Sequence, residues 1–526
     1  MSQNHLKSAP TKKEYAILAL ITGLISMCAL IFYYRQDALL LYGDAVAHIN
    51  IARRVFDSRT PGYLQLGTVW LPLPHVLDVP FVLSNWLWRT GIGPAIPSMV
   101  AYVAGTIGVF RLLRLFAASW CAWLAAAIYA LNPNMIYMQA TAMTESLYLT
   151  LVIWAIVYFA EFCIRAKDDP GTGRRSLEKC ALVVAAAMMT RYDAWFLATL
   201  LVAAAFIAVW QIRLYAWPVR NALIRFMLLL GLTGTLWLAY NYHAYGNALE
   251  FANGPYSARA IQERSRTPTM QTYPGENSPR TAALYFLKVT RLTLGDGSSE
   301  KWLMAMAFIG LLCWIFFERW WLPILLLWSP VIFYTLCIAW GSIPIYVPNW
   351  WPFSYYNTRY GLQMLPAVAV GCGLLAAFLG KYIPKKAILA FIAMVLAWSY
   401  AGVWGARPIV LREAVANGMA RVNFERRLAA DLRKLPASAT LMMDCGAFPG
   451  AIQSAGIPFR RVLRESNPPY WEEALAQPAR SADYVIAINH DAVAHAVQAN
   501  PEGLESVAEV GTPGGAHATI YRSRLR

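Results

Sequence analysis

The sequence has few charged residues. Asp, Glu, Lys and Arg make up 14% of its 526 residues, and 58% are hydrophobic. Soluble domains ordinarily contain about 25% charged residues, so this composition excludes an ordinary soluble protein and predicts an integral membrane protein. The eight cysteines show neither a disulfide framework nor the spacing of a zinc knuckle, which excludes a fold held together by either.

The basic residues exceed the acidic ones, with a formal net charge of +16. Most of them stand in short runs beside apolar segments, where they attract anionic head groups and fix the orientation of a membrane protein. We therefore expect membrane lipids as partners and no nucleic acid. The first apolar run, 16–34, is longer than a signal-peptide core and lacks a clear cleavage site, so it is expected to remain as the first transmembrane helix.

Eleven apolar windows are long enough to cross a membrane. They fall near 15–34, 94–115, 117–134, 143–164, 179–196, 197–212, 222–243, 301–317, 320–341, 359–380 and 386–405. With a cytoplasmic N-terminus, every inside connection carries positive charge, as the positive-inside rule requires. These residues are Arg111 and Arg114; Arg165, Lys167, Arg174, Arg175 and Lys179; Arg213, Arg220 and Arg225; Arg319; and Lys381, Lys385 and Lys386. The outer connections are then 35–93, 135–142, 244–300 and 342–358.

The segment from 407 onward has the composition of a small soluble domain, and an odd number of crossings places it outside. In it, "ATLMMDCG", "RRVLRES", "ADYVIAIN" and "HATIYRS" predict strands, and "ERRLAADLRKL" and "YWEEALAQ" predict helices. No phosphate-cradling Gly-rich loop or nucleophile elbow occurs there. The fold class expected is mainly α: a polytopic transmembrane bundle, 1–406, followed by an extracytoplasmic α/β domain, 407–526.

The stretch "YGDAVAHINIARRVF", 42–56, brings charged groups to the end of the first apolar run. Asp44 and His48 share one helical face, Arg53 and Arg54 lie further round, and Ile49, Ala52 and Phe56 form an apolar stripe. Such a helix is expected to lie along the membrane surface, where Asp44 could meet a lipid-borne substrate. The alternative is structural, because Asp is a favoured helix N-cap.

"YGDAVAH" in this position resembles the GT-C superfamily of membrane glycosyltransferases, which includes protein O-mannosyltransferases and aminoarabinose transferases acting on lipid A. The resemblance implies transfer of a sugar from a polyprenyl-phosphate or diphosphate carrier, with an essential Asp in the first outer loop, here Asp44. Many relatives carry an Asp-Glu pair where this chain has Asp44 and Ala45. No cofactor is implied with certainty, and a divalent metal stays open.

Four further segments are similar to the family. "NPNMIYMQATAMTESLYL" carries Glu145, "MMTRYDAWFL" carries Arg191 and Asp193, "YNYHAYGNALEFANGPYSA" opens a long outer loop, and "YYNTRYGLQMLP" carries Arg359 and Tyr360. Each has a structural alternative. Glu145 suits a first helical turn through the helix dipole, Arg191 and Asp193 suit an interfacial ion pair, and Arg359 suits contact with head groups.

The expected function is that of an inverting glycosyltransferase in the plasma (inner) membrane, acting on the outer, periplasmic side. Asp44 is the predicted general base. Arg359 and one of Arg53 or Arg54 are expected to hold the departing phosphate, assisted by Tyr360. The predicted substrate-binding set comprises His48, Arg53, Arg54, His75, Glu145, Arg191, Asp193, Arg359 and Tyr360. For His48 and His75 the alternatives are a hydrogen-bonding role in the loop and a metal role.

The donor is expected to be a polyprenyl-phosphate sugar and the acceptor a hydroxyl of a lipid, a glycan or a protein. Two other classes stay open. A transporter or lipid-carrier flippase would place charges near mid-membrane and show interrupted helices and an internal repeat, whereas the charges here fall at helix ends. A catalytically silent scaffold with an outward domain is the third.

Overall fold

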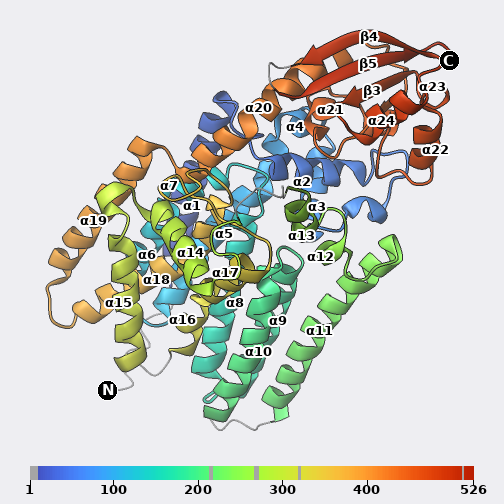
Figure 1. The fold of residues 1–526 in the computed structure, drawn as a ribbon. Helices are drawn as coiled ribbons and strands as arrows, with labels where there is room; N and C mark the ends of the chain where they lie inside the picture. Colours follow the sequence, from blue (N-terminus) through green and yellow to red (C-terminus); the bar gives the residue numbers. More distant parts are fainter. Residues whose placement is uncertain (1–9, 212–216, 266–271, 318–320, 512–514) are drawn as a thin grey trace. The chain divides into compact units, whose positions relative to one another are not determined.

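The computed structural model describes residues 10–211, 217–265, 272–317, 321–511 and 515–526, and the expected positions Arg213 and Arg319 lie outside them. Within these ranges, nine helical segments are long and apolar enough to cross a membrane (Figure 1). They are Lys12–Arg35, Ile92–Arg114, Glu145–Arg165, Asp193–Gln211, Trp217–Tyr245, Gly297–Phe317, Leu322–Trp340, Thr358–Leu379 and Lys385–Leu432. The predicted polytopic, mainly helical membrane fold is confirmed.

Two of the eleven expected spans differ from the structure. The window 117–134 contains only the twelve-residue helix α6 (Ser119–Ala130). The chain breaks there because a second short helix, α7 (Pro133–Met138), begins at Pro133 and has Asn132 as its N-cap. The window 179–196 is divided by a turn before Asp193. Its first part belongs to α9 (Pro170–Met188), which begins earlier and carries charged residues in its first half.

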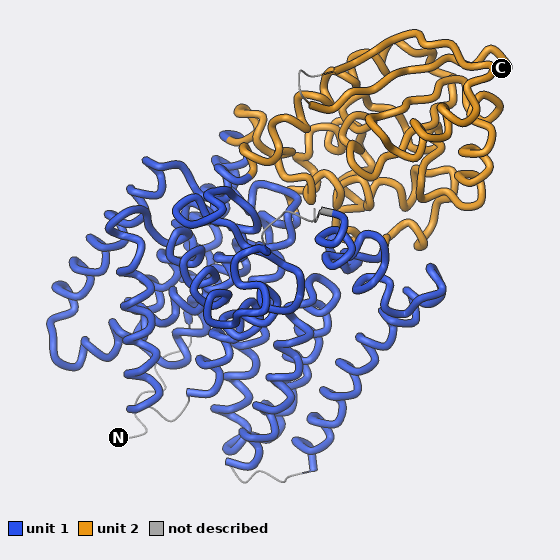
Figure 2. The backbone as a smooth tube through the Cα atoms, viewed as in Figure 1, with its two compact units in different colours: residues 1–32, 68–74, 97–413 blue, residues 33–67, 75–96, 414–526 orange. Residues whose placement is uncertain are grey.

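The chain divides into two compact units, drawn in different colours in Figure 2. Unit 1 comprises 1–32, 68–74 and 97–413, and unit 2 comprises 33–67, 75–96 and 414–526. The first outer loop therefore packs largely with the C-terminal segment, whereas the sequence interpretation grouped 35–93 with the membrane helices. The reason is that the loop contributes its own buried helices to unit 2, among them α2 (Gly43–Arg54).

Unit 1 is helical. Its remaining elements, including those that continue across its boundaries, are α1 (Lys12–Arg35), α5 (Ile92–Arg114), α8 (Glu145–Arg165), α10 (Asp193–Gln211), α11 (Trp217–Tyr245), α12 (Glu250–Asn253), α13 (Ala258–Ser265), α14 (Pro279–Leu294), η2 (Gly297–Ser299), α15 (Trp302–Phe317), α16 (Leu322–Leu326), α17 (Ser329–Trp340), η3 (Thr358–Met364), α18 (Leu365–Leu379) and α19 (Lys385–Ala406).

Helices α15 and α18 of unit 1 approach each other closely at glycines. A Cβ atom added at Gly310 would meet the backbone of Gly371, and one added at Gly371 would meet the backbone of Ala307 at 2.6 Å. Small residues allow such contact between membrane helices, whose association depends on van der Waals packing because lipid is as apolar as the side chains. The glycines therefore help to hold the apolar helices together.

Unit 2 contains short helices and one sheet. Its helices are α2, η1 (Tyr63–Leu66), α3 (Leu73–Val82), α4 (Asn85–Thr90), α20 (Ile409–Leu432), α21 (Pro449–Ala455), η4 (Phe459–Arg461), α22 (Tyr470–Ala476), α23 (Pro478–Ser481) and α24 (Ala492–Ala499), of which α3 and α20 start in unit 1. Its strands are β1 (Leu441–Met443), β2 (Val462–Leu463), β3 (Tyr484–Ile488), β4 (Leu504–Gly511) and β5 (His517–Ser523).

The sheet has the order β2-β1-β3-β5-β4. Strands β2, β1 and β3 are parallel, and β5 pairs antiparallel with both β3 and β4. The predicted α/β character of the C-terminal segment is confirmed, and all four expected strands and both expected helices occur. The prediction missed β4. Its sequence "LESVAEVG" has few large apolar residues, and most of its side chains are exposed.

Candidate functional site

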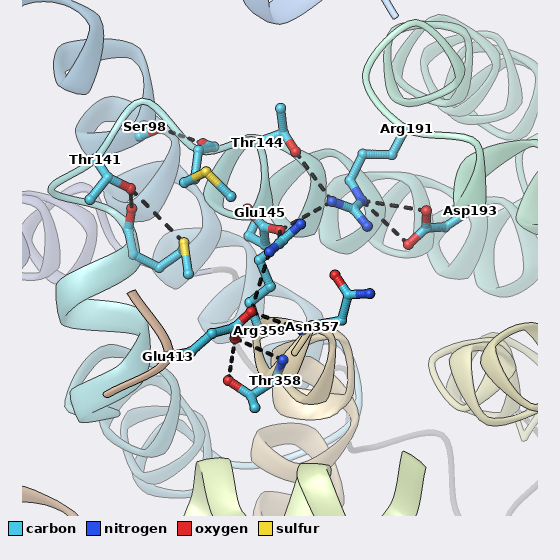
Figure 3. A network of polar contacts seen from close by, with 12 residues as sticks. Ser98, Thr141, Thr144, Glu145, Arg191, Asp193, Asn357, Thr358, Arg359 and Glu413 are labelled. Carbon is cyan, nitrogen blue, oxygen red and sulfur yellow. Dashed lines mark hydrogen bonds and ion pairs between the residues drawn. The ribbon is translucent and has the colours of Figure 1, made fainter. Parts of the chain in front are cut away.

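A buried network of alternating charges occupies unit 1, and Glu145 is its centre (Figure 3). Its Oε1 atom lies 3.1 Å from Nη1 of Arg191 and 3.2 Å from Nε of Arg359. The side chain of Glu145 is fully buried, while those of Arg191 and Arg359 are 14% and 11% exposed. One carboxylate therefore joins two arginines that the sequence analysis had selected independently.

Arg191 extends the network toward α10. Its Nε atom lies 3.4 Å from Oδ1 of Asp193, and its Nη2 atom donates to the hydroxyl of Tyr334 at 3.1 Å. That hydroxyl in turn donates to Oδ2 of Asp193 at 2.5 Å. The expected ion pair between Arg191 and Asp193 is present, but it is one part of a larger arrangement rather than an isolated surface pair.

Arg359 extends the network in the other direction. Its Nη1 atom lies 3.6 Å from Oε1 of Glu413. The Glu413 carboxylate also accepts hydrogen bonds from the backbone N–H groups of Asn357 and Thr358, both at 2.8 Å, and from the Thr358 hydroxyl at 2.5 Å (Figure 3). Glu413 therefore fixes the backbone that carries Arg359.

Tyr360 lies beside both guanidinium groups. The Cζ atoms of Arg191 and Arg359 are each 5.2 Å from the centre of its ring. A cation over an aromatic face is attracted by the ring quadrupole. The predicted residues Glu145, Arg191, Asp193, Arg359 and Tyr360 thus come together in one place.

The charges of this network stand where helices begin. Glu145 is the first residue of α8, Asp193 is the first residue of α10, and Arg359 lies in η3 immediately before α18. Carboxylates at helix N-termini are stabilised by the helix dipole. Three carboxylates face two guanidinium groups and hold the arginines in fixed directions. Such preorganised donors suit the stabilisation of charge that develops during a reaction.

Sequence reasoning missed Glu413 and Tyr334. Glu413 stands in the sequence "IVLREAV", which is typical of an amphipathic helix and carries no site signal, and Tyr334 lies within the apolar helix α17. The signal available for Tyr334 was a polar hydroxyl in an apolar helix. A buried Tyr hydroxyl usually requires a hydrogen-bond partner, so it points to a polar neighbour.

Asp44 lies in unit 2, in the first turn of α2. Tyr42 occupies the N-cap position of this helix and no side chain caps it, so the capping alternative for Asp44 is wrong. The side chain of Asp44 is half-buried, and the helix begins eight residues after α1 ends. The predicted apolar stripe is buried at Ile49 and Ala52, while Phe56 is exposed.

His48 and His75 form a buried pair in unit 2. Nδ1 of His48 and Nε2 of His75 are 2.8 Å apart, so the hydrogen-bonding interpretation of both residues is confirmed. Burial, together with the positive charge of a protonated His48 and of Arg54, holds the pKa of His75 well below its usual range. His48 stands one helical turn after Asp44 on the same face of α2.

Arg53 and Arg54 are held by neighbouring groups of unit 2. Arg53 donates to a carboxylate oxygen of Asp57 and to the backbone carbonyl of Val82 at 2.8 and 2.6 Å, and its guanidinium lies 4.7 Å from the ring of Trp88. A further nitrogen donates to the side chain of Asn85 at 2.8 Å. Arg54 donates to the backbone carbonyl of Gln65 at 3.0 Å. The contacts of Arg53 hold α2 and α4 together.

A metal centre would need a set of converging ligands. No group of three or more His, Cys, Asp or Glu side chains able to hold a metal ion occurs in the described part of the chain. Ala45 occupies the position next to Asp44 where a second carboxylate would stand.

No family model and no curated protein matches the sequence. Among solved structures, the chain is similar to ArnT from Cupriavidus metallidurans bound to undecaprenyl phosphate, with a TM-score of 0.57 and 13% identity over 97% of this chain and 98% of that chain. It is also similar to the oligosaccharyltransferase AglB from Archaeoglobus fulgidus in complex with an inhibitory peptide and a dolichol-phosphate. There the TM-score is 0.53 and the identity 11%, over 97% of this chain and 74% of that chain.

Both similarities extend over nearly the whole chain and include the membrane helices and the C-terminal segment. The chain therefore shares the fold of these two solved structures, as expected for a polytopic helical membrane protein with a small C-terminal sheet.

Proposed function

We propose that this protein is an inverting glycosyltransferase that moves a sugar from a polyprenyl-phosphate carrier to an acceptor hydroxyl on the outer side of the plasma (inner) membrane. The observation that carries the proposal is the fold shared with ArnT along 97% of the chain, with Asp44 in the first turn of the helix that follows the first membrane span. The acceptor hydroxyl belongs to a lipid, a glycan or a protein.

In the proposed reaction the Asp44 carboxylate accepts the proton of the acceptor hydroxyl as its oxygen attacks the anomeric carbon. A bond forms between that oxygen and the carbon, and the bond between the carbon and the phosphate oxygen breaks. The phosphate leaves with the bonding electron pair, and the anomeric centre inverts because there is a single displacement. No covalent intermediate between sugar and protein is required.

Arg359 is the proposed partner of the departing phosphate, because a guanidinium offers several donors in a fixed fork. Glu145 and Glu413 hold this fork from two sides. Arg191, Asp193 and Tyr360 are proposed as positioning residues that keep the fork in place. Arg53 is assigned a structural role, because its contacts with Asp57, Val82 and Asn85 hold α2 and α4 together.

The position of the charges favours transfer over transport. A transporter is expected to place ionisable residues near mid-membrane, on interrupted helices. Here Glu145, Asp193 and Arg359 stand at the beginning of helical segments. These residues therefore lie at the ends of candidate membrane spans rather than at their middle.

The experiment that tests the proposal uses membranes containing the protein and a panel of radiolabelled polyprenyl-phosphate sugars. Products are separated into lipid, glycan and protein fractions, and the anomeric configuration of the linkage is determined. Transfer that depends on the protein and inverts the configuration is expected. Movement of the labelled lipid across the membrane without any transfer would instead identify a flippase. A chelator in parallel reactions measures metal dependence.

A further inference from the structure

A second candidate site lies in unit 2, in a pocket of about 830 Å³ that none of the roles above uses. The pocket is lined by the end of α1, by the segment that follows it, and by residues of α2, α4, α20 and α21. Its volume falls in the range of about 300 to 1,000 Å³ that is common for sites binding small molecules. All the residues that line it belong to unit 2.

Two arginines of this pocket converge on one oxygen atom. Nη2 of Arg89 donates to the backbone carbonyl of Ser454 at 3.2 Å, and Nη2 of Arg433 donates to the same oxygen at 2.6 Å. Neither arginine forms an ion pair with any residue that the structure describes. Two guanidinium groups held so close repel each other, so an anion bound between them would be favoured.

The carboxylates of the pocket do not supply that anion. Asp37 lies 3.1 Å from Arg426, and Glu425 lies 2.5 Å from Arg421 while it accepts the backbone N–H of Gly450 at 3.0 Å. Each carboxylate therefore already has a cationic partner. The charge of Arg89 and Arg433 remains as an excess within the pocket.

Backbone geometry makes room for Arg89. Gly456 has a φ of +76°, which L side chains rarely adopt, and a Cβ atom there would lie 3.1 Å from Cδ of Arg89. A side chain at this position would therefore press on the arginine. The glycine ends α21 and lets Arg89 lie against the turn.

The surroundings indicate an amphiphilic ligand. Trp86 is 58% exposed and Tyr34 is 40% exposed, and both line the pocket. Tyr34 stands in the last turn of α1, a candidate membrane span. Exposed Trp and Tyr side chains at the end of a membrane helix are typical of the level of lipid head groups. Leu39 and Leu40 also line the pocket.

We propose that this pocket binds the phosphate-bearing head group of an anionic membrane lipid, with Arg89 and Arg433 as the phosphate ligands and Trp86 and Tyr34 at its apolar rim. A phosphate oxygen accepts from the guanidinium nitrogens, and the adjoining glycerol and acyl carbons lie against the aromatic rings. This site is separate from the proposed role of Asp44, and its occupation is measured as binding, independently of turnover.

The test uses the full chain, purified in detergent, and native mass spectrometry with added phosphatidylglycerol or phosphatidylcholine. Wild type is expected to retain phosphatidylglycerol preferentially. In the Arg89→Ala/Arg433→Ala variant, the dissociation constant for phosphatidylglycerol should rise by at least about tenfold, since charge-assisted hydrogen bonds are lost. The Arg427→Ala/Arg480→Ala variant, which removes two exposed arginines of the same unit outside the pocket, should bind like wild type.

Inorganic phosphate is the second probe and distinguishes a lipid from a soluble ligand. If inorganic phosphate displaces phosphatidylglycerol at equal concentration, the pocket is a site for a soluble anion and the lipid proposal is overturned. Equal binding of the two lipids by wild type, or unchanged binding by the pocket variant, overturns it as well. Should the double variant fail to fold, Trp86→Ser, at the exposed rim, is expected to weaken phosphatidylglycerol binding in a folded protein.

Discussion

The Nε atom of Arg359 lies 3.2 Å from Oε1 of Glu145, and this pair joins η3 to the beginning of α8 in unit 1. Glu145 is fully buried and also contacts Arg191, so one carboxylate lies against two guanidinium groups. The Oε2 atom of Glu145 accepts no hydrogen bond from any described residue. The carboxylate therefore depends on the two arginines for its stability, and they depend on it.

Replacement Glu145→Gln should destabilise the protein. Removing one partner of a buried ion pair typically costs about 3 to 5 kcal/mol, because the remaining charge is left uncompensated. We expect the lower end of this range, since Asp193 and Glu413 still contact the arginines. Thermal unfolding followed by intrinsic fluorescence in detergent measures the effect.

The matched control is Glu178→Gln. Glu178 pairs with Arg225 at 2.9 Å, but the arginine is 63% exposed. Exposed ion pairs contribute about 0 to 1 kcal/mol, so the control should unfold close to the wild-type temperature. Equal loss of stability in both variants would contradict a central role of Glu145.

Replacement Asp44→Asn should reduce glycosyl transfer by about 10² to 10⁴-fold, the usual effect of losing a general base. The amide has the same shape, so α2 should remain folded. Initial rates with a polyprenyl-phosphate sugar donor and an excess of acceptor measure the loss, and thermal unfolding checks the fold. A folded Asp44→Asn protein with wild-type rates would exclude Asp44 as the base.

Replacement Arg359→Lys should lower turnover while leaving one positive charge between Glu145 and Glu413. An ammonium cannot reproduce the fork of a guanidinium, and loss of one preorganised donor to a developing anion typically costs about 10² to 10³-fold in rate. Comparison of initial rates with abundance in the membrane separates catalysis from folding. A rate within twofold of wild type would remove Arg359 from the phosphate contact.

Replacement Arg53→Lys should lower stability and leave turnover unchanged, the opposite of the effect expected for Arg359→Lys. Arg53 connects Asp57, Val82 and Asn85 through separate nitrogens, and a lysine can satisfy only part of this set. Loss of hydrogen bonds from a charged group costs about 1.5 to 3 kcal/mol each, so the unfolding temperature should fall. The rate per folded molecule should remain near that of wild type, and a selective loss of rate would return Arg53 to the list of phosphate ligands.

The sequence permitted the fold class to be predicted because hydropathy and charge placement are local properties. The apolar runs, the strands around Leu441 and Val485, and the helix after Tyr42 follow from short-range patterns. The motif segments around Glu145, Arg191 and Arg359 come from distant parts of the chain. Their convergence on one carboxylate needed the tertiary structure.

Other parts of the site could not be predicted from local pattern. Glu413 is an ordinary acidic residue of an amphipathic segment, and only packing brings it to the backbone N–H of Thr358. Likewise, nothing in the sequence indicates that Arg89 and Arg433 share the carbonyl of Ser454. The hydrogen bonds that define both places join residues far apart in the chain.

The pair His48 and His75 predicts a pH dependence of stability. The pKa of His75 is lowered by burial and by the positive charges of His48 and Arg54, so the folded protein holds His75 neutral while the unfolded chain binds a proton below pH of about 6.5. The unfolded state then binds more protons, and stability should fall as the pH drops below this value, by up to about 1.4 kcal/mol per pH unit. Above pH of about 6.5 the imidazole of His75 is neutral in both the folded and the unfolded state, so it no longer makes stability depend on pH.

The measurement compares unfolding temperatures of wild type and His75→Gln between pH 5 and pH 8. Glutamine can place an amide where Nε2 of His75 meets His48, but it does not titrate. The difference between wild type and variant should therefore change with pH below about 6.5 and stay constant above it. His495, which is exposed on α24, provides the matched control, and His495→Gln should leave the pH profile unchanged. Parallel profiles for wild type and His75→Gln would mean that burial does not perturb His75.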